Sequence, residues 1–164
     1  MTAPQHKLAL DEAELLVRIA ALPRPLIFTN GVFDILHRGH ASYLHRAREL
    51  GGSLLVAVNS DKSVRMLGKG DDRPINAEFD RAYMLAALAS TTLVTVFREK
   101  TPVRLISVVK PDIYVKGGDY DMEQLEETAL VRTWGGRSLA MPFVEGYSTT
   151  SLVWKMKTDP NASR

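Results

Sequence analysis

The chain of 164 residues contains no cysteine, which excludes disulfides, thiolate metal sites, iron–sulfur clusters and thiol catalysis. An excess of one charge is also lacking, because 21 Lys and Arg face 19 Asp and Glu, for a net charge of +2. Nucleic-acid surfaces need clustered basic residues, so no nucleic-acid partner is expected. No apolar run approaches the ~18 residues of a transmembrane helix, and no signal peptide opens the chain. We therefore expect a soluble, cytoplasmic protein without a membrane partner.

What is present is the composition of a folded domain, with 45% hydrophobic and 24% charged residues. A chain of 164 residues matches one domain, since domains typically run ~100–200 residues. We expect a single domain over residues 1–164. It divides into an N-terminal tail and helix at 1–23, of which 1–10 are loose, a core at 24–155, and a frayed tail at 156–164.

Short apolar runs alternate with helical patterns along the core. The runs are continuous rather than alternating, as in strands buried on both faces of a parallel sheet. They cover residues 26–29, 54–58, 93–97, 113–115 and 139–144. Helical patterns cover residues 11–22, 40–50, 60–67, 77–89, 101–110, 122–134 and 149–157. This order predicts an α/β fold, a Rossmann-like doubly wound sheet of about five parallel strands with helices on both faces.

In such sheets ligands bind beyond the carboxyl ends of the strands, near the point where the strand order reverses. The loops that follow strands are therefore the places to look for chemistry. Two common phosphate-binding patterns are missing: no G-x-G-x-x-G follows the first strand, and no G-x-x-x-x-G-K-[ST] occurs. A dehydrogenase or a P-loop ATPase is thus disfavoured.

The loop after the first strand carries two histidines in the segment TNGVFDILHRGH, residues 29–40. His37 and His40 are three residues apart, so they share a face on the first turn of a helix. Gly31 and Gly39 leave room for a ligand against the backbone. Free N–H groups at a helix N-terminus together with two imidazoles suit a polyphosphate. A zinc site would need a third protein ligand, and ordinary polar residues at a helix start remain an alternative.

Two motifs carry a resemblance to a known family. GVFDILHRGH resembles the G-x-F-D-x-x-H-x-G-H signature of the cytidylyltransferase-like nucleotidyltransferases, and STTS at 148–151 resembles the hydroxyl-rich element that opens their last helix. These enzymes join a nucleoside triphosphate to a phosphorylated small molecule and release pyrophosphate. The resemblance covers residues 24–155, so the HxGH type of nucleotidyltransferase fold is implied.

Within that superfamily the chain is most similar to stand-alone D-glycero-β-D-manno-heptose 1-phosphate adenylyltransferases. The motifs behind this are TNG at 29–31, RPIN at 73–76, DRA at 80–82, PD at 111–112 and VKGGDY at 115–120. The resemblance implies transfer of AMP from ATP to the sugar 1-phosphate, giving ADP-heptose for lipopolysaccharide biosynthesis. It also implies Mg²⁺ bound with ATP and a homo-oligomer, with a dimer favoured. Two alternatives stay open: a cytidylyltransferase acting on glycerol 3-phosphate or another alcohol phosphate, and a non-catalytic nucleotide-binding protein.

The resemblance and the loop positions together nominate the site residues. The catalytic candidates are His37, His40 and Lys116. Nucleotide-binding candidates are Asn30, Gly31, Phe33, Gly39, Gly118, Asp119, Ser148, Thr149 and Thr150. Candidates for binding the substrate phosphate are Lys69, Arg73 and Arg81, and no protein ligand is assigned to Mg²⁺.

Several of these candidates have a plainer interpretation. Thr149 and Thr150 can simply cap a helix, and Phe33 can be a core aromatic. Arg81 can be a solvated surface charge, and Asp119 a turn residue. Asp34 is expected to organise the hydrogen bonds of its loop rather than contact substrate, and Asp61 may only cap a helix.

Overall fold

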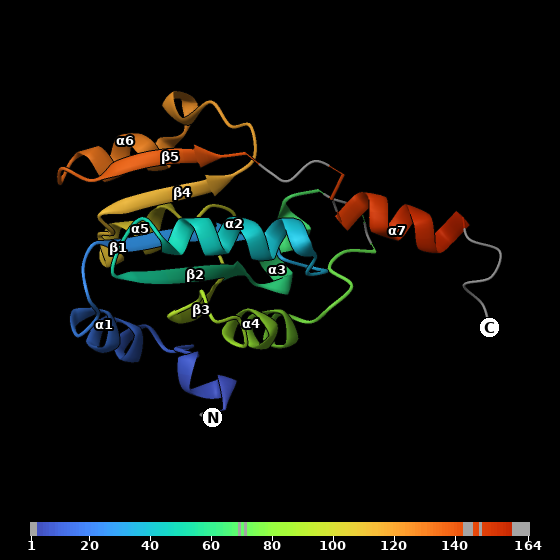
Figure 1. Cartoon of the computed structure of the whole chain (residues 1–164), viewed down its shortest axis with the longest axis horizontal. Helices are drawn as coiled ribbons and strands as arrows, with labels where there is room; N and C mark the ends of the chain where they lie inside the picture. Colours follow the sequence, from blue (N-terminus) through green and yellow to red (C-terminus); the bar gives the residue numbers. More distant parts are fainter. Residues whose placement is uncertain (1–2, 69, 71, 143–145, 148, 159–164) are drawn as a thin grey trace.

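A parallel sheet of five strands, in the order β3-β2-β1-β4-β5, forms the centre of the computed structural model (Figure 1). The structure describes residues 3–68, 70, 72–142, 146–147 and 149–158. The strands are β1 (Leu26–Gly31), β2 (Ser53–Asn59), β3 (Leu93–Phe97), β4 (Ile113–Gly117) and β5 (Arg137–Met141). All adjacent strands pair in parallel. The predicted doubly wound sheet is confirmed.

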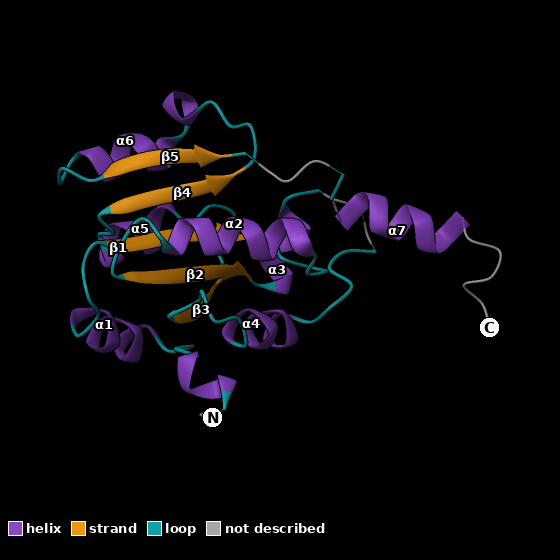
Figure 2. Ribbon diagram, viewed as in Figure 1, coloured by secondary structure: helices purple, strands orange, loops and turns teal. Residues whose placement is uncertain are grey.

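Helices cover both faces of this sheet (Figure 2). The α-helices are α1 (Glu12–Ala20), α2 (Arg38–Arg48), α3 (Asp61–Met66), α4 (Glu78–Ala86), α5 (Val103–Val109), α6 (Glu126–Arg132) and α7 (Thr149–Thr158). Two short 3-10 helices, η1 (Pro4–Lys7) and η2 (Met122–Gln124), complete the described elements. None of the helices in the described residues is both long and apolar enough to cross a membrane.

Successive strand residues face opposite sides, so the sheet separates two hydrophobic cores. Ile27 joins the core that α2 and α4 cover, through residues such as Leu44 and Leu85. Leu26 and Phe28 join the other core, which α1, α5 and α6 cover. Because both faces are covered, the central strands have no polar face. This explains why their sequences are continuous apolar runs.

The strand order places the ligand edge between β1 and β4. From β1 the chain moves outward through β2 to β3, and then α5 returns it to β4 on the other side of β1. The order therefore reverses at the β1–β4 pair, and a crevice is expected beyond the carboxyl ends of these strands. Figure 1 shows α7 beyond that same end of the sheet.

The N-terminal segment is more ordered than expected. Residues 1–10 are predicted to be a loose tail, but Leu8 pairs with Val94 in a parallel bridge and Ala9 N–H donates to the Val94 carbonyl at 2.9 Å. Leu8 and Ala9 are buried, and Lys7 donates to the Leu88 carbonyl at 2.9 Å. The prediction is wrong for the described residues of this segment, because the segment is too short to show a period but pairs with the exposed edge of β3.

Two element boundaries also differ from the prediction. The fifth strand, expected at 139–144, begins at Arg137 and ends at Met141, and residues 143 and 144 lie outside the described part. As an edge strand it is partly exposed, so its apolar run does not mark its ends. The helix expected at 122–134 is divided into η2 and α6, because Leu125 adopts an extended backbone (φ −88°, ψ 128°) and packs against the core.

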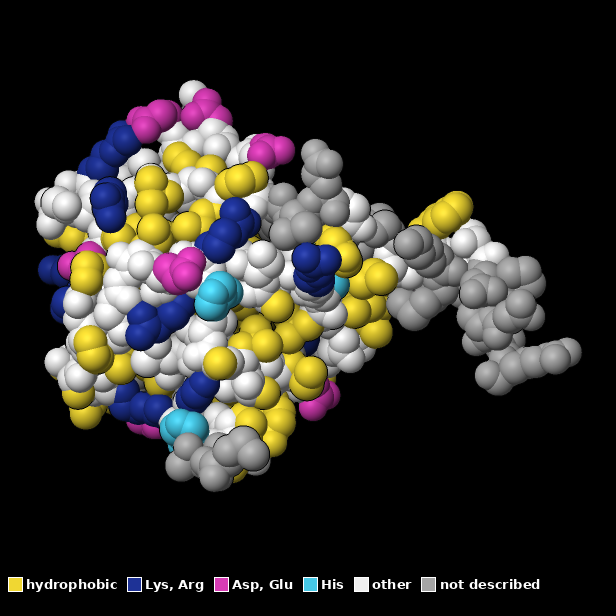
Figure 3. Space-filling view, in the orientation of Figure 1, with side chains coloured by type: hydrophobic (Ala, Val, Ile, Leu, Met, Phe, Trp, Pro, Cys, Tyr) yellow, Lys and Arg dark blue, Asp and Glu magenta, His cyan; other side chains and the backbone are white. Residues whose placement is uncertain are grey.

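One face of the molecule carries mixed charges (Figure 3). On the face shown in Figure 3, basic and acidic side chains are scattered among apolar ones rather than gathered into one patch.

Arg81 is a structural residue, and its assignment to substrate phosphate is corrected. Its side chain is fully buried. Nε donates to the Asn76 carbonyl at 2.9 Å, and Nη1 to the Val32 carbonyl at 2.6 Å. Nη2 pairs with Asp61 at 2.7 Å. The guanidinium thus ties α4 to the loop after β1 and to the start of α3, where Asp61 is a salt-bridge partner and Ser60 is the helix cap.

We predict that Arg81→Met lowers the free energy of unfolding by about 2–4 kcal/mol, because two carbonyls and a carboxylate lose their donor. Urea unfolding monitored by circular dichroism measures this loss. Arg104→Met is the matched control: Arg104 pairs with Glu12 and Glu99 but is half-exposed, so its loss should stay below about 1 kcal/mol. Equal losses in the two variants would contradict the structural role of Arg81.

Candidate active site

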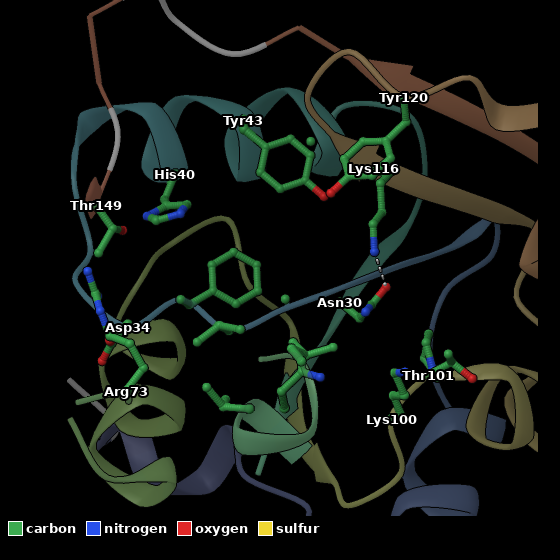
Figure 4. A pocket seen from close by; sticks show the side chains of 18 of the residues that line it. Asn30, Asp34, His40, Tyr43, Arg73, Lys100, Thr101, Lys116, Tyr120 and Thr149 are labelled. Carbon is green, nitrogen blue, oxygen red and sulfur yellow. Dashed lines mark hydrogen bonds and ion pairs between the residues drawn. The ribbon is translucent and has the colours of Figure 1, made fainter. Parts of the chain in front are cut away.

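A cavity of about 670 Å³ opens at the carboxyl ends of β1, β2 and β4 (Figure 4). Its lining includes the end of β1 and the loop after it, α2, the end of β4, the loop before α5, and the start of α7. The lining residues used below are Asn30, Gly31, Phe33, Asp34, His40, Arg73, Lys100, Thr101, Lys116, Tyr120, Glu127 and Thr149. The cavity lies where the strand order predicts a ligand, and its size is typical of small-molecule sites.

Phe33 shapes the loop between β1 and α2. Its backbone has φ 50°, a left-handed conformation that is unusual for a bulky residue. Its ring is buried and meets His40 edge-on, with the ring centroids 5.3 Å apart. A Cβ on Gly31 would lie 2.9 Å from Cε2 of Phe33. Gly31 is therefore required by the Phe33 ring, and the expected open space against its backbone is filled.

His37 and His40 lie together at the start of α2, as their spacing predicts. The two rings stack with centroids 3.8 Å apart and an angle of 22° between planes. A Cβ on Gly39 would lie 2.9 Å from Nδ1 of His37 and 3.2 Å from Cβ of Tyr147. Gly39 thus allows the His37 ring to fold over the helix start. His40 lines the cavity, whereas His37 packs behind it, between His40 and Tyr147.

Both imidazoles are disposed to be neutral. Burial, with a further contribution from His37, lowers the pKa of His40 to about 4, although the Ile35 backbone opposes this shift. Burial also lowers the pKa of His37. The Nδ1 atoms of both rings are buried and have no hydrogen-bond partner in the described part of the chain. Buried polar atoms are rarely left unpaired, and exceptions are typical of sites that bind a ligand.

Asp34 anchors the loop, as the sequence predicts. Its carboxylate accepts hydrogen bonds from Ile75 N–H and Asn76 N–H at 2.9 Å and from Arg73 Nη1 at 2.9 Å. Burial alone would raise the pKa of Asp34, but these donors and the Arg73 charge lower it overall. Arg73 stays at the cavity wall with one nitrogen committed to Asp34. It is therefore placed to contact an anion while it also supports the loop.

A second polar group lies on the β4 side of the cavity. Lys116 Nζ donates to Oδ1 of Asn30 at 3.4 Å, and the Tyr114 hydroxyl donates to the same oxygen at 3.0 Å. Figure 4 shows Asn30 and Lys116 pointing toward one another, away from His40. Nζ of Lys116 also lies 5.4 Å from the centre of the Tyr120 ring. Lys116 thus ends a buried strand at the ligand edge, as predicted.

Of the remaining candidates, some line the cavity and others do not. Thr149 lines the cavity, and its hydroxyl lies 3.5 Å from the Ile35 carbonyl. Gly118, with φ 123°, donates its N–H to the Met141 carbonyl at 2.7 Å. Asp119 is exposed and does not line the cavity. Lys69, Ser148 and the side chain of Thr150 lie outside the described residues.

Sequence reasoning missed several contributors to the site. Lys100 and Thr101 line the cavity, although Thr101 was singled out only as the start of a helix. Tyr114 and Glu127 were not nominated, because one lies within an apolar run and the other within a helical pattern. The position of 100–101 after the third strand was the available signal. In the described residues no group of three or more His, Asp or Glu side chains gathers as a metal site.

The doubly wound sheet, the paired imidazoles at its first strand–helix junction and the threonine at its last helix agree with the resemblance to the α/β nucleotidyltransferases. Residues 28–155 match the cytidylyltransferase-like family, and the chain belongs to that family. The family match covers most of the chain, including both sequence motifs.

Curated relatives narrow the comparison. The chain is 59% identical over 150 residues to the D-beta-D-heptose 1-phosphate adenylyltransferase of Bordetella bronchiseptica, covering 90% of this chain and 93% of that protein. It is 52% identical over 133 residues to the bifunctional protein HldE of Nitratiruptor, covering 81% of this chain and 28% of that protein. The chain therefore spans nearly all of the first relative and about a quarter of the second.

Solved structures support the fold. The lipopolysaccharide core biosynthesis protein of Thermoplasma volcanium superposes with a TM-score of 0.61 at 29% identity, covering 75% of this chain and 98% of that one. Pantothenate synthetase of Thermus thermophilus superposes with a TM-score of 0.59 at 20% identity, covering 84% of this chain and 62% of that one. The second likeness concerns the fold alone.

The low pKa of His40 predicts a specific pH dependence of stability. The unfolded chain, with an ordinary histidine pKa near 6.5, binds more protons than the folded chain between about pH 6.5 and 4. Stability therefore falls as the pH falls through this window, by up to about 3 kcal/mol from His40. Urea unfolding at pH 6.5, 5.5 and 4.5 should show a smaller decline in His40→Gln. His45→Gln changes an exposed side chain of α2, so its free energy of unfolding should fall with pH as in wild type. If the free energy of unfolding fell equally with pH in all three proteins, the low pKa of His40 would not be the cause.

Proposed function

We propose that the chain transfers AMP from ATP to D-glycero-β-D-manno-heptose 1-phosphate, giving ADP-heptose and pyrophosphate. The observation that carries this proposal is the stacked imidazole pair, whose buried Nδ1 atoms have no partner in the described residues, at the ligand edge of a nucleotidyltransferase fold. The substrate assignment rests on the 59% identity to the Bordetella adenylyltransferase. The ADP-heptose would serve lipopolysaccharide biosynthesis, and we place the reaction in the cytoplasm.

The reaction needs positioning more than it needs covalent chemistry. An oxygen of the sugar 1-phosphate attacks the α-phosphorus of ATP in line, a new P–O bond forms, and the bond to the β-phosphate oxygen breaks to release pyrophosphate. The attacking oxygen is already anionic, so no base has to remove a proton from it. The protein then contributes by orienting the two phosphates and stabilising the charge that develops between them.

His40 and His37 would supply that stabilisation as donors to the α- and β-phosphate oxygens. A neutral imidazole offers one N–H donor, and a bound anion favours the protonated ring, which offers two. Thr149 and the free N–H groups at the start of α7 would meet the far end of the triphosphate. Ser148 and Thr150 are assigned the same task from their motif alone.

Basic side chains would hold the phosphate of the sugar. Lys116 and Arg73 both line the cavity, and Lys69 is retained as a candidate from its place in the sequence. Arg81 is omitted, since all three of its nitrogens are bonded within the fold. Mg²⁺ would enter as the counterion of ATP, held by phosphate oxygens and water, and no residue of this chain is assigned to it.

Substrate choice is tested by pyrophosphate release. We expect release with ATP and heptose 1-phosphate, and turnover at least about tenfold lower when CTP replaces ATP or glycerol 3-phosphate replaces the sugar, which corresponds to ~1.4 kcal/mol of discrimination. A preference for CTP with glycerol 3-phosphate would replace the proposal by a cytidylyltransferase. Tight ATP binding without release from any phosphate acceptor would favour a non-catalytic nucleotide-binding protein.

The role of the imidazoles is tested by His40→Ala. Loss of one donor to the transition state should lower kcat about 10²–10³-fold, by analogy with deletions in oxyanion holes. The variant should keep the circular dichroism spectrum of the wild type. His45→Ala, on the same helix but exposed, is the control and should keep full activity. Near-normal turnover in His40→Ala would remove the mechanism.

A further inference from the structure

The cavity contains a carboxylate to which neither the fold nor the reaction assigns a task. Glu127, in the first turn of α6, is only 8% exposed and lines the cavity. It makes no hydrogen bond or ion pair with any described residue. A charged side chain is rarely buried without a partner, because losing its water costs free energy. The side chain is therefore poised for a partner that arrives from the cavity.

The surroundings of Glu127 leave its oxygens available. Burial raises the pKa of the Tyr114 phenol, and the charge of the nearby Glu127 raises it further. Yet the single proton of the Tyr114 hydroxyl is donated to Oδ1 of Asn30. The neighbouring phenol thus satisfies Asn30, and both carboxylate oxygens of Glu127 can accept hydrogen bonds from a ligand.

The chemistry of a carboxylate restricts the group that it can recognise. An ionised carboxylate only accepts hydrogen bonds, and it repels phosphate. Its two oxygens match two adjacent hydroxyls, as when an acidic residue binds ribose in dinucleotide-binding folds. The phosphate-suited end of the cavity lies at His40 and Thr149, and Figure 4 shows Lys116 and Tyr120 on the opposite side. A ligand that binds at His40 and extends across the cavity would therefore reach the β4 side.

We propose that Glu127 is a specificity-determining residue that accepts hydrogen bonds from a vicinal diol of a bound substrate. This inference rests on the proposed function, since both ATP and heptose 1-phosphate carry a vicinal diol on a sugar that also bears phosphate. The sequence nominated Asp119 for nucleotide binding, but that residue is exposed and outside the cavity lining. We assign the recognition of the diol to Glu127 instead, which lies in α6, after Asp119 in the chain.

The experiment compares Glu127→Gln with Glu126→Gln, an exposed neighbour on the same helix. Glu127→Gln should raise the KM of one substrate about tenfold or more with a smaller change in kcat, because hydrogen bonds to a charged group are among the stronger ones. Glu126→Gln should leave both KM values within about twofold. Urea unfolding should show Glu127→Gln to be as stable as wild type or more stable, since no internal partner is lost.

Deoxy substrates identify the sugar that is recognised. If the diol is the ribose, 2′-deoxy-ATP or 3′-deoxy-ATP should raise the wild-type KM about tenfold but add less than about twofold in Glu127→Gln. If the diol is in the heptose, analogues that lack one ring hydroxyl should show this pattern instead. Two results would overturn the inference. One is that Glu127→Gln has the wild-type KM for both substrates. The other is that every deoxy substrate raises KM by the same factor in wild type and in Glu127→Gln.

Binding calorimetry separates this inference from the proposed function. Should no acceptor give pyrophosphate, the affinities of ATP, its deoxy analogues and heptose 1-phosphate for wild type and Glu127→Gln still report on diol recognition. If Glu127→Gln binds a natural ligand more weakly than wild type does but binds one of its deoxy analogues equally well, the role of Glu127 is supported even in a protein without turnover. Equal affinities throughout would reject it.

Discussion

The positions of the two imidazoles depend on how the loop between β1 and α2 is anchored. Asp34 does this from within the loop, by accepting two backbone N–H groups from 75–76 and the Arg73 guanidinium. Arg81 does it from outside, by donating to the Val32 carbonyl while paired with Asp61. Because the loop is held at both points, it can keep Phe33 in a left-handed conformation that costs of order 1–3 kcal/mol. The ring of Phe33 in turn supports His40.

The two sides of the cavity carry different ionisable groups. On the α2 side lie the two stacked imidazoles, and their partial burial is the main cause of their lowered pKa values. On the β4 side, the Lys116 ammonium lines the cavity, and the buried Glu127, whose charge lies near Tyr114 of β4, lines it as well. The two sides thus offer a ligand different groups: imidazoles on the α2 side, and both a cation and a carboxylate on the β4 side. That arrangement fits substrates in which a sugar is joined directly to phosphate.

Much of the fold could be predicted from the sequence because the physical signals are local. Continuous apolar runs marked the buried central strands, and the spacing of His37 and His40 placed them on one face of a helix turn. The predictions failed where the outcome depends on distant partners. Arg81 has the same sequence signature whether it is solvated or buried, and only the carbonyls of Val32 and Asn76 decide this. Likewise, nothing near Glu127 in the sequence indicates that its helix turns it toward the cavity.

The pairing of the N-terminal segment with β3 has a consequence for the behaviour of the chain in solution. An exposed strand edge offers unpaired N–H and carbonyl groups to any other extended segment, which is how sheets recruit further copies. Leu8 and Ala9 occupy part of that edge at Val94 and cover its apolar side chains. A chain shortened to begin at Asp11 would uncover this edge and leave it open to pairing with a second copy of the chain.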